Sequence, residues 1–140
     1  MNTSVILRPE TPPVADYRRL RRITGLSEKS NDDARHGLGQ TWFGVTAFDG
    51  ELPVGMGRII GDGGTVLMLV DMAVDPAYQG RGIGKRILGR LMAQIESEAA
   101  GSAYVCLFAD GDARYLYEKF GFRATAPETI GMAWRRVQRE

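Results

Sequence analysis

A turn rich in glycine and basic residues carries the clearest chemistry in the sequence. Positions 79–85 read Gln-Gly-Arg-Gly-Ile-Gly-Lys, and a segment with helical spacing of apolar residues follows directly. The N–H groups at the start of a helix have no partner within the helix, and the helix dipole adds partial positive charge there. The glycines allow a ligand to approach the backbone closely, and Arg81, Lys85 and Arg86 add full positive charge. These residues therefore predict a cradle for a phosphate group.

Three glycine-rich templates compete for this turn. The dinucleotide fingerprint needs a third glycine where Lys85 stands, and the P-loop needs a glycine at Gln79 and a hydroxyl residue at Arg86. The third template, Gln/Arg-x-x-Gly-x-Gly/Ala, matches residues 79–84 at every fixed position. An ordinary strand-to-helix turn is the alternative, but such a turn does not need three basic residues.

The third template is the pyrophosphate-binding signature of the GNAT N-acyltransferase superfamily, whose members bind acyl-coenzyme A. A second motif, Tyr-Glu-Lys-Phe-Gly-Phe at 117–122, matches the Tyr-Glu-Lys-x-Gly-Phe run that GNAT enzymes commonly carry after the next strand. The run at 55–64 also looks like one found in small bacterial members. Over most of residues 40–135 the chain resembles a GNAT acetyltransferase of this small, single-domain kind.

The resemblance implies transfer of an acetyl group from acetyl-coenzyme A to an amine, with no metal. It places Tyr117 in the general-acid position, where a phenol protonates the departing coenzyme A thiolate. It also places a strand N–H near Val74 as the donor to the developing oxyanion. Asp110 stands where many members have an asparagine that contacts the cofactor. The cofactor-binding residues implied in this way are Met72, Ala73, Val74, Gln79, Gly80, Arg81, Gly82, Ile83, Gly84, Lys85, Asp110 and Tyr117.

The acceptor side rests on charged residues in apolar strands. Asp71 interrupts an apolar run, which is costly unless the carboxylate is paired or functional. It is a candidate base or amine anchor, and a buried ion pair with Arg58 is the equally weighted structural explanation. Arg58 could instead bind a substrate carboxylate through its planar fork. Trp42 is a candidate wall of the acceptor pocket or a core residue, while Asp62 and Glu51 are weaker candidates for the acceptor side.

The leading functional hypothesis is an N-acetyltransferase acting on a primary amine of a small molecule, such as an amino acid or a polyamine-like amine. A protein lysine or N-terminus is the main alternative acceptor. A non-catalytic acyl-coenzyme A-binding module is the alternative of a different class, and the presence of Tyr117 favours an enzyme.

Composition bounds the remaining possibilities. The chain has 140 residues, which suits a single domain over residues 1–140, and its net charge of +1 gives no reason to expect nucleic acid or membrane as a partner. The basic cluster Arg18, Arg19, Arg21 and Arg22 is expected to be the solvated face of a helix. The family resemblance makes a homodimer an expectation.

Single cysteine and histidine residues limit other chemistry. Cys106 lies in an apolar run and is expected to be a buried small hydrophobe, and His36 alone cannot form a multi-histidine metal site. The sequence has no 18-residue apolar run, and its start lacks the pattern of a signal peptide, so a cytoplasmic location is expected.

The elements that must position these residues follow from hydrophobic periodicity and turn signals. Ser30 is expected to cap a helix, and Asp49-Gly50 to form a hairpin turn. Strands are predicted at 3–8, 41–48, 54–60, 65–74, 104–109, 122–125 and 131–135, and helices at 14–24, 30–37, 82–99 and 112–119. This order predicts an α+β fold with a mixed, mainly antiparallel central sheet and helices on both faces.

Overall fold

The computed structural model describes residues 4–136, and the chain divides into two compact units after Leu107. The first unit holds five strands, three helices and a short 3-10 turn. In chain order these are β1 (Val5–Arg8), α1 (Val14–Ile23), α2 (Asn31–Leu38), β2 (Phe43–Asp49), β3 (Leu52–Gly61), β4 (Val66–Val74), η1 (Pro76–Tyr78), α3 (Ile83–Glu98) and β5 (Tyr104–Cys106). The predicted start of the first strand at Thr3 lies outside the described residues.

The five strands form one sheet in the order β1-β2-β3-β4-β5. Neighbouring strands are antiparallel from β1 to β4, whereas β4 and β5 are parallel and pair only from Val66 to Met68. The crossover that parallel pairing requires is α3. The mixed, mainly antiparallel sheet expected from the sequence is therefore confirmed.

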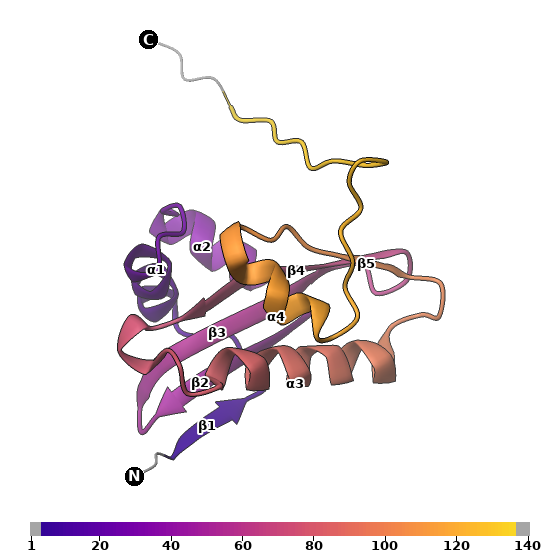
Figure 1. The fold of residues 1–140 in the computed structure, drawn as a ribbon. Helices are drawn as coiled ribbons and strands as arrows, with labels where there is room; N and C mark the ends of the chain where they lie inside the picture. The colour runs from indigo at the N-terminus through magenta and orange to yellow at the C-terminus, as the bar shows by residue number, and fades with distance from the viewer. Residues whose placement is uncertain (1–3, 137–140) are drawn as a thin grey trace. The chain divides into compact units, whose positions relative to one another are not determined.

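Helices cover both faces of this sheet (Figure 1). On one face, Ile83, Ile87 and Leu91 of α3 pack where Gly55 and Gly57 leave β3 without side chains. The opposite face is covered by α1, whose apolar residues form one cluster with β3 and β4. Its buried members are Tyr17, Leu20, Ala34, Met56 and Ala73. Met56 thus points away from the two neighbouring glycines, as the alternation of a strand requires.

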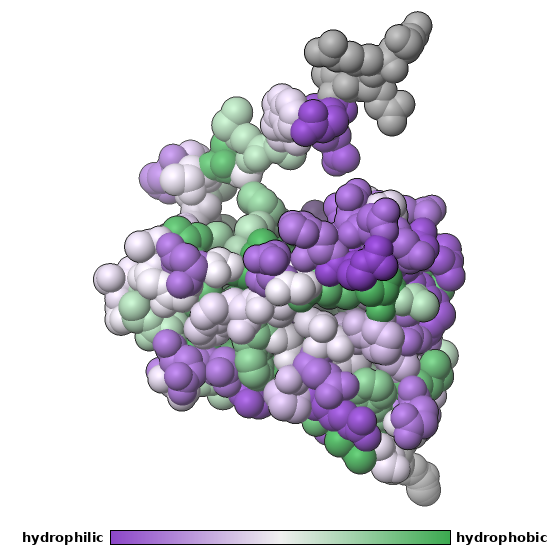
Figure 2. Space-filling view, turned by 180° about the vertical axis from the view of Figure 1, so that it is seen from behind, coloured by the Kyte–Doolittle hydropathy of each residue, from purple (hydrophilic) through white to green (hydrophobic). Residues whose placement is uncertain are grey.

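The α1–α2 layer is amphipathic. Its buried side chains are few, and its outer side is hydrophilic, as the purple region at the upper right of Figure 2 shows. The hydroxyl oxygen of Ser30 accepts the Asp33 N–H at 3.1 Å and caps α2, as the sequence predicted. Within residues 4–136, no helix is long and apolar enough to cross a membrane.

Strand β4 contains a bulge at Asp71. Met56 pairs with Ala73, but Arg58 pairs with Val70, so two residues of β4 stand opposite Gly57 alone. Asp71 adopts a left-handed backbone with φ of 60°, and among residues 4–136 no other non-glycine residue has a positive φ. A bulge of this type re-aims a side chain and increases the local twist of the strand.

The second unit holds a short 3-10 turn η2 (Gly111–Ala113) and the helix α4 (Arg114–Glu118), where the sequence predicted one helix. The strands predicted at 122–125 and 131–135 are absent from this described part of the chain, and β5 ends at Cys106 rather than at 109. Ile130, Met132 and Trp134 do alternate as strand residues would, yet they are 69%, 85% and 78% exposed. Alternation alone predicted those strands wrongly, because a strand also needs a partner for its backbone groups.

Candidate active site

The predicted phosphate cradle lies between β4 and α3. After Val74 the chain passes through η1 and reaches Gly80 and Gly82, which have φ of 81° and 80°. Residues with a Cβ rarely adopt this conformation, so the turn requires glycine at both positions. A Cβ built on either glycine meets no atom within 4 Å, so the side of the turn on which it would point is open to a ligand.

Backbone donors are available at this turn. The Arg86 N–H makes the first helical bond of α3, to the Gly82 carbonyl at 3.0 Å. The N–H groups of the three preceding residues therefore have no partner within the helix. Lys85 is exposed beside them, whereas the side chain of Ile83 is buried and leaves only its backbone for a ligand.

The basic residues of the turn divide into two groups. Arg81 stays at the cradle, where its guanidinium lies 4.9 Å from the centre of the Tyr78 ring and donates to the Ala77 carbonyl at 3.3 Å. Arg86 instead donates to the carbonyl of Val5 at 3.0 Å, which ties α3 to β1. The sequence-based expectation that Arg86 adds charge to the cradle therefore needs correction.

The outer edge of β4 is open beside the cradle. Strand β5 pairs with β4 only as far as Met68, so in the described part of the chain no strand borders β4 from Leu69 to Val74 on that side. The Asp75 N–H donates to the Val54 carbonyl in β3 at 2.8 Å, and the Val74 carbonyl faces the other way and accepts from Gln79 Nε2 at 3.0 Å. Since the N–H and C=O of a strand residue point to the same side, the Val74 N–H also faces the open edge.

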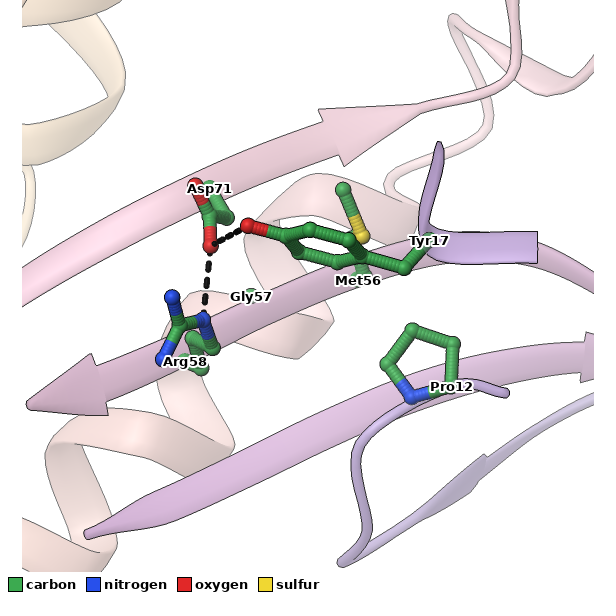
Figure 3. A pocket seen from close by; sticks show the side chains of 6 residues that line it. All are labelled: Pro12, Tyr17, Met56, Gly57, Arg58 and Asp71. Atoms are coloured by element: carbon green, nitrogen blue, oxygen red, sulfur yellow. Dashed lines mark hydrogen bonds and ion pairs between the residues drawn. The ribbon is translucent and has the colours of Figure 1, made fainter. Parts of the chain in front are cut away.

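A buried cluster of charged and polar side chains lies on the α1 face of the sheet (Figure 3). Asp71 Oδ1 accepts from Arg21 Nη1 at 2.6 Å, while Oδ2 accepts from Arg58 Nε at 2.6 Å and from the Tyr17 hydroxyl at 2.7 Å. The side chains of Asp71, Arg21 and Arg58 are only 9%, 7% and 14% exposed. A small hollow between α1 and the sheet is lined by Pro12, Tyr17, Met56, Gly57, Arg58 and Asp71.

The ionisation of the cluster follows from its burial and its bonds. Burial raises the pKa of the Tyr17 phenol, and the hydrogen bond to Asp71 raises it further. Burial lowers the pKa of Arg58, but the bond and the charge of Asp71 outweigh this effect and leave the pKa raised. Tyr17 is thus a neutral hydrogen-bond donor and Arg58 a fixed cation at neutral pH.

The sequence revealed neither Tyr17 nor Arg21 as members of this cluster, and it placed Arg21 elsewhere. The sequence places it on a solvated helix face, but the residue is 6% exposed and pairs with Asp71 across 50 positions of the chain. One signal was present in the sequence, since Tyr17 and Arg21 share a helix face at i and i+4. The sequence also shows that a buried Asp71 needs a cationic partner, which must come from an element that packs against β4.

A family model for the acetyltransferase (GNAT) domain matches residues 39–124. The chain belongs to the GNAT acetyltransferase family. Among solved structures, it is 41% identical to a protein of unknown function from methicillin-resistant Staphylococcus aureus, described as a probable acetyltransferase. The two superpose with a TM-score of 0.90 over 95% of this chain and 100% of that chain.

Curated relatives cover a smaller part of this GNAT protein. It is 33% identical over 81 residues to histone acetyltransferase TAP1 of Glycine max, which covers 58% of this chain and 34% of that protein. It is 39% identical over 54 residues to the [ribosomal protein bS18]-alanine N-acetyltransferase of Haemophilus influenzae, which covers 39% and 37% of the two chains. The chain thus spans about a third of the length of these curated relatives.

Two predicted acceptor-side residues of the GNAT domain have structural partners. Asp62 Oδ1 accepts the Gly64, Thr65 and Val66 N–H groups at 2.9, 2.7 and 3.2 Å, and Oδ2 accepts the Thr65 hydroxyl at 2.6 Å. These bonds, led by those from Thr65, lower the pKa of Asp62 and occupy its carboxylate. Trp42 is half-buried with its indole nitrogen against Gly63. Both residues shape the β3–β4 turn, and their contact with an acceptor stays a prediction.

A second nitrogen of the Arg58 guanidinium, Nη1, is also engaged. Its Nη1 donates to the Thr41 hydroxyl at 3.1 Å and to the Gly37 carbonyl at 3.3 Å. With Nε bound to Asp71 and Nη1 bound to Thr41 and Gly37, the guanidinium cannot offer free donors on two neighbouring nitrogens to a substrate carboxylate. The ion pair between Arg58 and Asp71 is present, and the substrate-binding role of Arg58 stays a prediction that this geometry does not favour.

The predicted general acid lies in the second unit. Tyr117 in α4 is 8% exposed, and burial, followed by the negative charge of Asp110, raises the pKa of its phenol. The phenol therefore carries its proton at neutral pH, as an acid must.

Cys106 is a half-buried free thiol and His36 is exposed. Among the described residues, no group of three His, Cys, Asp or Glu side chains is arranged to hold a metal ion.

Proposed function

We propose that this GNAT domain transfers the acetyl group of acetyl-coenzyme A to a primary amine of a small molecule. The observation that carries the proposal is the continuous run from the open edge of β4 into the glycine turn at the start of α3. Open space beside Gly80 and Gly82 and unpaired N–H groups fit a pyrophosphate. The edge from Met72 to Val74 fits an extended arm that pairs with backbone.

The reaction forms a bond between the amine nitrogen and the acetyl carbon and breaks the bond from that carbon to sulfur. The Val74 N–H on the open edge is the proposed donor to the carbonyl oxygen as negative charge develops there. Tyr117 is the proposed acid, and its proton goes to the sulfur that leaves as a thiolate. The amine loses one proton, so the products are an amide and a free thiol.

The base for the amine proton is assigned to water. Both oxygens of the Asp71 carboxylate already accept hydrogen bonds from the side chains of Tyr17, Arg21 and Arg58. We therefore do not assign the amine proton to this carboxylate.

A primary amine of a small molecule is the acceptor that we propose first. A protein amine is the second candidate because two of the relatives carry names that specify histones and an alanine of a ribosomal protein. A cytoplasmic location and a homodimer stay predictions.

A thiol-release assay with acetyl-coenzyme A and a panel of amino acids, polyamines and peptides tests the proposal. Turnover on a small amine supports it, and turnover on peptides alone favours the protein acceptor. Gly82→Asp places bulk and negative charge in the cradle, so we expect affinity for acetyl-coenzyme A to fall at least about 100-fold. The exposed Arg22 provides the matched control Arg22→Gln.

Two outcomes would reject the proposal. Unchanged cofactor affinity in a folded Gly82→Asp variant would show that the glycine turn does not bind the cofactor. Cofactor binding without turnover on any amine or peptide would identify a binding module instead. Tyr117→Phe separates the acid from the cradle, because it should lower kcat about 10- to 1000-fold and leave cofactor affinity within about threefold.

A further inference from the structure

We infer that Arg21, Arg58 and Tyr17 act as positioning residues, which hold Asp71 in its left-handed conformation and thereby set the open edge of β4. The inference rests on the proposed function, since that edge is where the acetyl donor would bind. It assigns Asp71 a role different from the base or the amine anchor. It also gives a function to Arg21, which contacts neither the cradle nor the open edge.

The backbone of Asp71 needs an external restraint. A left-handed conformation brings Cβ close to the following carbonyl oxygen and is unfavourable for residues other than glycine, although aspartate and asparagine tolerate it best. Inside a strand, such a conformation persists where the surroundings fix it. Asp71 has φ of 60° and lies inside a strand rather than in a loop. The two residues of β4 opposite Gly57 therefore stay in register only while something outside the strand holds the bulge.

The restraint comes from two different elements. Arg58 belongs to β3, whereas Arg21 and Tyr17 belong to α1, and all three donate to the Asp71 carboxylate at 2.6–2.7 Å. Figure 3 shows Arg58 and Tyr17 approaching the same carboxylate oxygen from different sides. Charge-assisted bonds of this length in a buried setting are strong and directional.

Arg21 is itself held in place. Its Nε donates to the Ser27 carbonyl at 2.6 Å, and Nη2 donates to the Ser27 hydroxyl at 3.0 Å. The guanidinium carbons of Arg21 and Arg58 lie 5.7 and 5.8 Å from the centre of the Tyr17 ring. Arg21 thus connects the segment between α1 and α2 to the bulge. Through this connection the helices restrain the backbone conformation of Asp71 in the sheet.

The bulge controls the position of the last residues of β4. Met72, Ala73 and Val74 come directly after Asp71, and in the described residues no strand supports their outer side. A change in the Asp71 backbone therefore moves the Val74 N–H relative to the cradle. A misplacement of about 1 Å at a reacting group costs about 100-fold in rate.

Steady-state kinetics and cofactor titration of single variants test this inference. For Arg21→Gln we expect kcat to fall about 10- to 100-fold and affinity for coenzyme A to fall by a smaller factor, because the edge that holds the arm moves whereas the cradle is a separate element. Arg22→Gln on the exposed side of α1 is the matched control. Tyr17→Phe removes one hydroxyl and keeps the shape of the side chain, so it serves as the test if Arg21→Gln does not fold. For this variant we expect kcat to fall about 3- to 10-fold.

Substitutions of Asp71 separate positioning from base catalysis. Asparagine tolerates the left-handed conformation and still accepts hydrogen bonds, whereas alanine does neither. We therefore expect Asp71→Asn to keep at least about tenfold more kcat than Asp71→Ala, with the pH profile of the wild type. Equal losses in both variants, with the acidic limb of the profile gone, would make Asp71 a base and overturn the inference.

A readout independent of turnover separates this inference from the proposed function. We expect the backbone amide NMR signals of Met72 and Val74 to shift in Arg21→Gln and not in Arg22→Gln. If the wild type acetylates no amine but these signals shift, the proposed function fails and the structural role stands. A folded Arg21→Gln variant with wild-type kcat or unshifted β4 signals would refute the inference, whatever the acceptor.

Discussion

Replacing Gly57 with alanine tests whether the bare surface of β3 sets the packing of α3. A Cβ at Gly57 would lie 2.5 Å from Met72 Sδ, 3.0 Å from Ile87 Cγ2 and 3.1 Å from Leu91 Cδ1. Ile87 and Leu91 are 0% exposed on the helix that packs against the sheet, so neither has free space to move into. The methyl group must therefore displace Met72 or push α3 outward.

The expected cost follows from two opposing effects. Overpacking a core by one methyl group costs about 1–3 kcal/mol. Alanine also restricts the unfolded chain, which returns about 0.4–1 kcal/mol. Because two of the three neighbours are fully buried, we expect the free energy of unfolding to fall by about 1–2 kcal/mol. Urea unfolding measures this change as a lower midpoint at an unchanged m-value.

Gly101→Ala is the control, because a Cβ there meets no atom within 4 Å. A double variant with Met72→Ala should recover part of the loss, with a coupling energy of about 1 kcal/mol. Equal stability of Gly57→Ala and Gly101→Ala would refute the packing argument. Strict additivity in the double variant would show that Met72 is not the side chain that the methyl group meets.

Two further predictions concern charge. Lys85→Met should weaken acetyl-coenzyme A binding about tenfold, whereas Arg86→Met should leave affinity within about twofold and lower the free energy of unfolding by about 1 kcal/mol, because Arg86 binds the Val5 carbonyl. Cofactor titration measures the affinities and urea unfolding measures the stabilities. Equal losses of affinity in the two variants would show that Arg86 contributes to cofactor binding. Burial and Asp71 raise the pKa of Tyr17 above its ordinary 10.0, so the folded state holds this proton more tightly and stability falls as pH rises above 10. Stability should fall less steeply in Tyr17→Phe, and equal slopes would contradict this assignment.

Local signals in the sequence predicted most of the elements. The Ser30 cap, the Asp49-Gly50 turn and the glycine turn before α3 each depend on residues within a few positions of one another. Such features follow from backbone geometry and capping, which the sequence displays directly. The glycine turn of the cradle was therefore predictable, whereas the position of the Arg86 side chain was not, because it depends on β1.

Long-range features were not predictable in this way. The pairing of Arg21 with Asp71 joins α1 to β4, and the periodicity of a helix does not show which charge it meets across the fold. The strand predicted at 131–135 is absent from the structure, since strand pairing depends on a partner elsewhere in the chain. Helical and strand patterns report which face a side chain prefers and not what lies opposite.

The bulge at Asp71 acts as a phase shift in β4. Before it, Leu67 and Leu69 share the α3 face with Ile59, and after it the same face is occupied by Met72, beside Gly57. Odd-numbered residues thus give way to even-numbered ones, because the inserted residue inverts the order of the two faces. Removing a single residue here would move the side chain of every later residue in β4 to the opposite face of the sheet. The number of residues in β4 after the bulge is therefore a stricter constraint on the fold than the identity of their side chains.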